Sequence, residues 1–200
     1  MNISKPYWVL LLPVAALFFS LPGSIPIQRM ENNELQTALA RVASDSLKAG
    51  YDVLVTGNHP EHELPPQRDC VTRSYRDGKE RIATALRVRD AEAKYGRSFS
   101  SVDVTLTPMG VDKVGGKVIL HAIEEEVEHY GFVTPPKDSR PQVTESRTNH
   151  DFVFSVTAVP DCDSSAPYIV CLSGERFLLI EDIIEPQLLH QEHGDFPIKH

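Results

Sequence analysis

Hydrophobic residues in the first half of the chain recur at helical spacing. Over residues 34–49 they lie three or four positions apart, which predicts an amphipathic helix that Gly50 ends. Residues 79–95 show a similar spacing and predict the main helix. Residues 69–76 are expected to begin a further helix, which the following Asp-Gly pair interrupts.

The pattern then changes to alternation with a period of two, which is typical of strands. Met109–Gly116 and Thr134–Thr148 have the composition of connections, and Pro186 is expected to end the last strand. A hairpin turn is predicted at Ser173-Gly174-Glu175-Arg176. The predicted strands cover residues 101–108, 117–132, 150–159, 168–172 and 177–184.

This order of elements predicts an α+β fold. Helices come first and strands follow, so the helices are expected to pack on one face of a curved, mostly antiparallel sheet. The expected single domain covers residues 29–186, and residues 187–200 form a flexible polar tail.

The N-terminus has the pattern of an export signal. Residues 7–21 are apolar apart from Ser20, and they follow Lys5 and precede Pro22-Gly23-Ser24. The apolar run is shorter than a full membrane span of about 20 residues. Residues 1–28 are therefore interpreted as a signal peptide or a signal anchor, with a buried core helix as the alternative. The domain is expected to be secreted or anchored outside the cytoplasm.

Charge and motifs exclude some functions. The net charge is −8, which argues against binding nucleic acid or an anionic lipid surface, because both need a basic face. Acidity that only keeps the domain soluble is the simpler reading. The chain contains no glycine-rich nucleotide-binding motif, no nucleophile elbow and no C-x-x-C pair, and no cofactor is expected.

The element order resembles the nuclear-transport-factor-two-like cone, the fold also used by ketosteroid isomerases and polyketide cyclases. It is similar, more narrowly, to the N-terminal domain of secreted bacterial proteins that carry a papain-like amidase. The matching pieces are Phe99–Leu106, Arg147–Val156 and Phe177–Asp182, and the resemblance covers about residues 35–186. It implies a cone-like sheet with a ligand pocket at its mouth. The amidase part has no counterpart here, so no catalytic residue is carried over.

An acidic run on the long strand is the first candidate site. Period two places Glu124, Glu126 and Glu128 on one face. In the fold that the chain resembles, these carboxylates would line the pocket mouth and bind a ligand, and Glu126 could act as a general base. The alternative is a solvated strand end that discourages edge pairing.

Tyrosines and histidines supply weaker candidates. Isomerases of the similar fold use a phenol as a hydrogen-bond donor, and Tyr95 and Tyr130 are the catalytic candidates beside Glu126. His59 and His62 lie close together in a polar loop and could bind a metal ion, with His121 or His129 as a third ligand. Tyr51 and Tyr75 are further candidates for the phenol donor. Half-buried aromatics and a solvated loop are the alternatives.

The chain has three cysteines. Outside the cytoplasm two of them should pair, and Cys162 and Cys171 flank a short loop between neighbouring strands. Cys70 would then remain reduced and partly buried.

Three functions are compatible with these features. The first is an exported, non-catalytic module that binds a small ligand or a protein partner through the cone. The second is a small isomerase or cyclase that uses Glu126 and a tyrosine. The third is an accessory protein for a neighbouring secreted or cell-envelope enzyme.

Overall fold

The computed structural model describes residues 25–132 and 142–193, with side-chain positions for residues 32–132 and 142–185. The segment predicted to direct export, residues 7–21, lies outside this part of the chain. The elements in chain order are α1 (Ile25–Thr56), β1 (Gln67–Asp69), β2 (Tyr75–Arg76), α2 (Gly78–Lys94), β3 (Arg97–Val114), β4 (Lys117–Phe132), β5 (Gln142–Ala158), β6 (Ile169–Leu172) and β7 (Glu175–His193).

The first helix is longer than predicted. The expected helix ended at Gly50, whereas α1 continues to Thr56. Val53 and Leu54 in this extension are buried, so packing outweighs the low helix propensity of Gly50. The helix ends at Gly57, whose φ is 75°. None of the helices in the described ranges is long and apolar enough to cross a membrane.

The predicted helix over residues 69–76 is wrong. This segment forms part of β1, a tight turn and β2, which pairs antiparallel with β1. The Asp69 carboxylate stabilises the turn by accepting hydrogen bonds from the backbone N–H groups of Val71 and Thr72, each at 2.8 Å. β1 also pairs in parallel with β7, so the sheet is mixed. Local sequence does not reveal this long-range pairing.

The start of α2 combines a cap with a close backbone contact. The Asp77 side chain accepts a hydrogen bond from the Glu80 N–H at 2.8 Å, which is the usual N-cap interaction. Gly78 follows, and a Cβ there would collide with the carbonyl oxygen of Leu64. The Asp-Gly pair therefore starts the helix, where the sequence interpretation had it interrupting one.

The strand order of the sheet is β2-β1-β7-β5-β4-β3, with β6 paired to β7. The four long strands β7, β5, β4 and β3 form most of it. β4 has the predicted bounds. The predicted connection over residues 109–116 is mostly strand, because β3 continues through a bulge between Pro108 and Gly110. Only Gly115 and Gly116 form the turn, with φ of 53° and 76°.

The last two long strands also exceed their predicted bounds. β5 already begins at Gln142, inside the predicted loop 134–148, of which residues 134–141 lie outside the described residues. β7 passes Pro186 and reaches His193, so residues 187–193 of the expected tail are strand. Pro186 is tolerated because β1 pairs with β7 only up to Ile184, which leaves one side of the strand open there.

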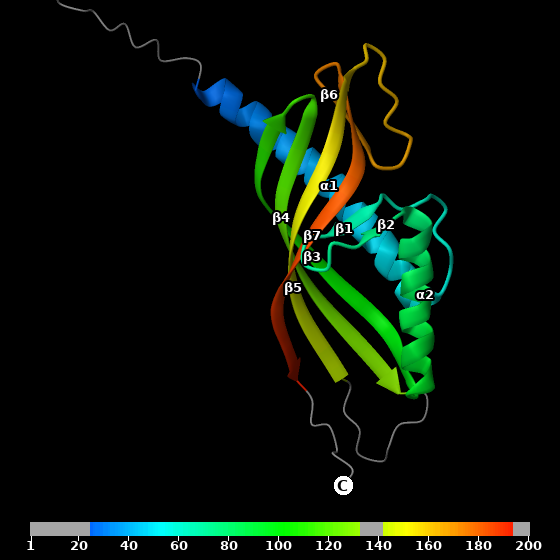
Figure 1. Cartoon of the computed structure of the whole chain (residues 1–200). Coiled ribbons are helices and arrows are strands. Elements are labelled where there is room, and N and C mark those ends of the chain that lie inside the picture. The colour runs from blue at the N-terminus through cyan, green and yellow to red at the C-terminus, as the bar shows by residue number, and fades with distance from the viewer. Residues whose placement is uncertain (1–24, 133–141, 194–200) are drawn as a thin grey trace, which may run out of the picture.

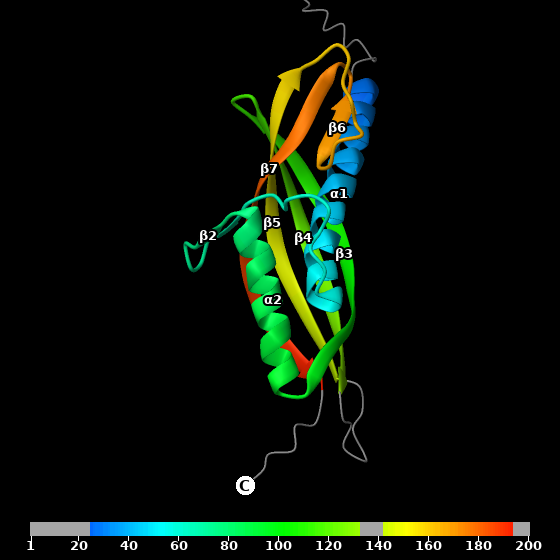
Figure 2. The same cartoon turned by 90° about the vertical axis from the view of Figure 1, so that its right-hand side faces the viewer.

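Both helices lie on one face of the sheet, and the described elements leave the other face uncovered (Figures 1 and 2). The main core lies between α1 and the first half of β4, joined by aromatic residues of β5 and β7. The structure therefore has an α+β fold with an open, mixed sheet, and the cone-like shape stays a prediction. The largest core side chains are Phe152, Phe154, Phe177, Leu39, Leu120, Val53 and Val118.

Candidate functional site

The second half of β4 places Glu124, Glu126 and Glu128 on the helix-facing side of the sheet. The first half of the strand fills the same side with core residues, and the alternation continues without a break. Each glutamate lies between a hydroxyl-bearing residue of β5 and an aliphatic residue of β3. These three rows, which we call the acidic strip, are Thr148–Glu124–Leu106, Ser146–Glu126–Val104 and Thr144–Glu128–Val102.

One end of the acidic strip contains a buried ionic cluster. The His150 Nδ1 lies 2.7 Å from Oδ1 of Asp182, and its Nε2 lies 2.8 Å from Oε2 of Glu124. The three side chains are between 1% and 4% exposed. They come from β5, β7 and β4, so strand pairing alone brings them together.

The His150 ring is an imidazolium. Two ionised carboxyl partners only accept hydrogen bonds, so they favour a ring that carries a proton on both nitrogens. Burial lowers the pKa of His150, but Asp182 and Glu124 outweigh burial and raise it to about 9. The pKa of Asp182 is lowered despite complete burial, because His150 and Arg81 stabilise its charge.

Two residues that lie outside β4, β5 and β7 complete this cluster. The Gln67 side chain donates to Oδ2 of Asp182 at 3.0 Å. Arg81 of α2 donates to the Pro65 carbonyl at 2.6 Å and acts electrostatically on Asp182. The cluster thus attaches β1 and α2 to the central strands.

Glu126 occupies the middle of the acidic strip and is half-buried. Its Oε2 accepts a hydrogen bond from the Ser146 hydroxyl at 2.9 Å. Burial, followed by the charges of Glu128 and Glu124, raises the pKa of Glu126 to about 8. The Glu126 carboxyl group therefore holds a proton at neutral pH in the free protein.

Two tyrosines lie beside the glutamates. Burial, then Glu124 and Glu126, raises the pKa of Tyr51 in α1 well above its ordinary value, which places its hydroxyl near both carboxyl groups. The Tyr130 hydroxyl donates to Oε2 of Glu128. The buried Glu124 carboxyl group thus has His150 on its Oε2 and the Tyr51 hydroxyl as a second hydrogen-bonding neighbour.

The remaining predicted phenols are exposed, although the Arg97 guanidinium lies 6.0 Å from the Tyr95 ring and 5.5 Å from the Tyr130 ring. Tyr95 is 77% exposed at the end of α2, and Tyr75 is 54% exposed in β2. Of the catalytic candidates named from the sequence, the structure brings together Glu126 and Tyr130 on one face of β4 and leaves Tyr95 outside.

The predicted metal ligands do not gather into one site. His59 and His62 are exposed in the loop after α1. His121 and His129 point to the uncovered face of the sheet, where they contact aspartates. Nowhere in the described part of the chain do three His, Cys, Asp or Glu residues lie in a position to hold a metal ion.

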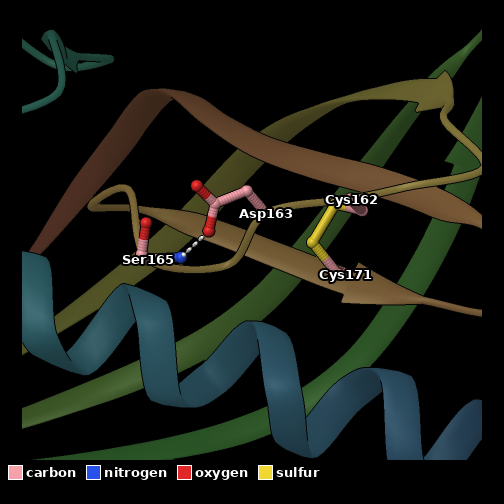
Figure 3. Close-up of a disulfide and its surroundings, with 4 residues drawn as sticks. All are labelled: Cys162, Asp163, Ser165 and Cys171. Atoms are coloured by element: carbon pink, nitrogen blue, oxygen red, sulfur yellow. Dashed lines mark hydrogen bonds between the residues drawn. A yellow bond between two sulfur atoms is a disulfide. The ribbon is translucent and has the colours of Figure 1, made fainter.

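The cysteines follow the predicted pairing. Cys162 and Cys171 form a disulfide, with Cα atoms 5.7 Å apart, between the β5–β6 loop and β6 (Figure 3). In the same loop Asp163 accepts a hydrogen bond from the Ser165 N–H at 2.8 Å. Cys70 is free and exposed, whereas the sequence interpretation had it partly buried. A disulfide fits an oxidising compartment.

Sequence reasoning missed the buried cluster. His150 stands among phenylalanines on the apolar face of its strand, and Asp182 stands beside Glu181 in a segment whose other residues are apolar. A single ionisable residue at an apolar position is the signal that could have revealed each of them. Their contact with Glu124 depends on strand register, which the pattern does not supply.

The two ends of the site suit different roles. The cluster of His150, Glu124 and Asp182 is closed to solvent and has its charges satisfied, so it serves as a support. Glu126 and Glu128 are half-buried and reachable, and Glu126 can donate or accept a proton. No protein-family model matches the chain, and no curated protein shows significant sequence similarity to it.

Proposed function

We propose that the protein is an exported, non-catalytic module that binds a small ligand or a protein partner at the acidic strip. The observation that carries the proposal is the placement of Glu126. It is half-buried between the Ser146 hydroxyl and the aliphatic side chain of Val104, and two further carboxyl groups flank it on the same strand.

Stability does not account for this arrangement. Three carboxyl groups along one partly buried strand disfavour each other's ionisation, and burial adds to this cost. A protein that only needed a core would be more stable with apolar residues at these positions. Perturbed ionisable groups that remain reachable from solvent are typical of binding sites and active sites. We therefore interpret the acidic strip as a site retained for a ligand.

The proposal that the protein is exported rests on the N-terminal segment, and the disulfide is compatible with it. A reporter enzyme fused after residue 40 should be active only outside the cytoplasm. In the exported protein, peptide mapping should find Cys162 linked to Cys171. Reporter activity in the cytoplasm equal to that of a leaderless control would contradict export and leave the binding site untouched.

An isomerase or cyclase is the second candidate. It is favoured by the high pKa of Glu126 together with the Tyr51 and Tyr130 hydroxyls, since an acid that stays protonated at neutral pH can give a proton to a substrate. The first proposal is preferred because Tyr130 is already engaged with Glu128, and Tyr51 is mostly buried.

The test is a ligand screen by methyl NMR on the mature protein. Val102, Val104 and Leu106 report on the acidic strip, and Leu35 and Val170 in the buried core serve as references. The proposal expects at least one class of small molecule to shift the first set of methyl signals and not the second. A screen in which every bound compound shifts only signals elsewhere would contradict it.

A further inference from the structure

We infer that the end of the sheet beside the β3–β4 turn holds a separate ligand site, which binds an aliphatic monocarboxylate, that is, a carboxylate group on a short hydrocarbon chain. This site is distinct from the acidic strip. Three features point to it: an open cavity, the apolar residues that line the cavity, and the surplus of positive charge around it.

The cavity has a volume of about 200 Å³ and lies between the β3–β4 turn and the start of β7. Both segments lie at the same end of the sheet (Figure 1). The apolar part of the lining consists of Val114, Val118, Val156 and Phe177. Val118 and Phe177 belong to the main core, and Val156 packs against it. A hydrocarbon group that enters the cavity therefore extends the core and leaves water.

Hydrogen bonds hold both sides of the cavity in place. The Val156 N–H donates to the Gly116 carbonyl at 3.1 Å, which ties the β3–β4 turn to β5. The Val159 N–H donates to the Gly174 carbonyl at 3.0 Å, which ties the β6–β7 turn to the end of the same strand. The cavity is thus already formed in the free protein, so a ligand does not have to order its walls.

The charged residues around the cavity are unbalanced. Lys113 and Lys117 line the β3–β4 side, and Glu175 lines the β7 side. Within the described part of the chain, none of these three side chains has an ion-pair partner. Asp112 precedes Lys113, but it contacts His121 on the uncovered face of the sheet at 3.2 Å. Two ammonium groups and one carboxylate leave one positive charge without a counterion, in a chain whose net charge is −8.

This combination favours one class of ligand. A carboxylate group supplies the missing negative charge and accepts hydrogen bonds from the lysine ammonium groups. Its hydrocarbon chain covers the apolar lining, which an inorganic anion would leave exposed. An organic cation is disfavoured, because both lysines repel it. Nucleic acid and anionic lipid surfaces need a wider basic face than two lysines provide.

The test titrates the mature protein with straight-chain n-alkanoates of increasing length at millimolar concentrations. The n-alkanol and the n-alkylammonium ion of equal length are the controls. The methyl signals of Val114, Val118 and Val156 report on the cavity. We expect the alkanoates to shift these signals and to leave those of the acidic strip unchanged. Each added methylene should tighten binding by up to about fourfold until the cavity is full.

Substitutions of the charged residues sharpen the test. Lys113→Gln and Lys117→Gln should each weaken alkanoate binding by about two- to fivefold, because each removes an attracting charge near solvent. The variant with both substitutions should bind more weakly than either. Glu175→Gln should strengthen binding by a similar factor, since it removes a repelling charge. Lys79→Gln is the matched control and should leave affinity unchanged, because Lys79 is an exposed lysine of α2 that does not line the cavity.

Three outcomes would overturn this site. If no alkanoate shifts the methyl signals of Val114, Val118 and Val156, the cavity does not bind this class of ligand. If the alkanol or the alkylammonium ion binds there as tightly as the alkanoate, the lysines do not select the ligand. Unchanged affinity in the variant that lacks both lysines would lead to the same conclusion. All three results leave the acidic strip standing as its own proposal, because its methyl signals are followed separately in the same spectra.

Discussion

Two histidines on opposite faces of the sheet each lie between two carboxylates, but in very different surroundings. His150 on the helix-covered face contacts Asp182 and Glu124 at 2.7 and 2.8 Å and is 2% exposed. His121 on the uncovered face contacts Asp151 and Asp112 at 2.7 and 3.2 Å and is 38% exposed.

The two histidines have similar hydrogen-bond geometry and differ in their exposure to solvent. Around His121, water screens the charges and can replace either aspartate when it moves away. Around His150, nothing described can replace a lost partner, so an uncompensated charge would remain in the interior. The same arrangement is therefore nearly neutral for stability on one face and essential on the other. Three substitutions in these two arrangements and one at the neighbouring Glu126 test the role of burial, from the largest expected effect to the smallest.

The first substitution is His150→Gln. It leaves two buried carboxylates without their shared cation, and we expect the free energy of unfolding to fall by about 3–5 kcal/mol. Urea denaturation followed by circular dichroism measures the change. A loss below about 1 kcal/mol would show that solvent reaches the cluster, and would remove the distinction between the two faces.

The second substitution is Asp182→Asn. The amide oxygen can still accept the Nδ1–H of His150, but the charge that stabilises the imidazolium is lost. We expect the pKa of His150 to fall below its value of about 9, and stability to fall by about 2–3 kcal/mol. NMR titration of the imidazole measures the first effect. Asp151→Asn is the matched control on the uncovered face, where stability should barely change.

The third substitution, Glu126→Gln, acts through pH. Because the pKa of Glu126 in the folded protein is raised to about 8, its contribution to stability is largest below its ordinary value of 4.5 and is lost as pH rises to about 8. Glutamine resembles the protonated acid, so the variant should match the parent at acidic pH. At about pH 9 it should be more stable by at least about 1 kcal/mol.

Denaturation curves measured across this pH range compare the parent with Glu126→Gln and Glu125→Gln. The raised pKa of His150 adds a separate loss of stability between its ordinary 6.5 and about 9, which all three proteins should share. Parallel profiles for the parent and Glu126→Gln would show that Glu126 titrates normally.

The fourth substitution, His121→Gln, should have the smallest effect. Hydrogen bonds to Asp151 and Asp112 raise the pKa of His121, so its contribution is present at acidic pH and is lost as pH rises above about 6.5. Exposure of the pair limits the change to below about 0.5 kcal/mol. Thermal denaturation at pH 5.5 and 8 measures it; a loss of several kcal/mol would mean that a partner covers this face in solution.

The elements predicted best were those in which local pattern and packing agree. The bounds of β4 follow from its alternation and its flanking turn, and α2 begins within one residue of the prediction. The predicted first helix ends too early, at Gly50, because the low helix propensity of glycine is outweighed by the burial of the apolar residues that follow. β1 was missed because parallel pairing with β7 joins segments more than a hundred residues apart.

The candidate site, like the fold, could be predicted from the sequence only in part. Period two correctly placed Glu124, Glu126 and Glu128 on one face, because side-chain direction in a strand depends only on position. The sequence could not show that Glu124 ends inside the core while Glu126 stays half-buried, since that depends on where α1 crosses the sheet. It also could not bring His150 and Asp182 to Glu124, because strand register arises from the assembled sheet.

The contact at the start of α2 limits how this sequence can diverge. A Cβ at Gly78 would meet the carbonyl oxygen of Leu64, and a backbone atom cannot rotate away as a side chain would. Related chains with the same fold should therefore keep glycine at this position while the exposed residues of α2 vary freely. An Asp-Gly pair that opens a helix, about a dozen residues after a buried Leu-Pro step, would be a useful marker for finding such relatives.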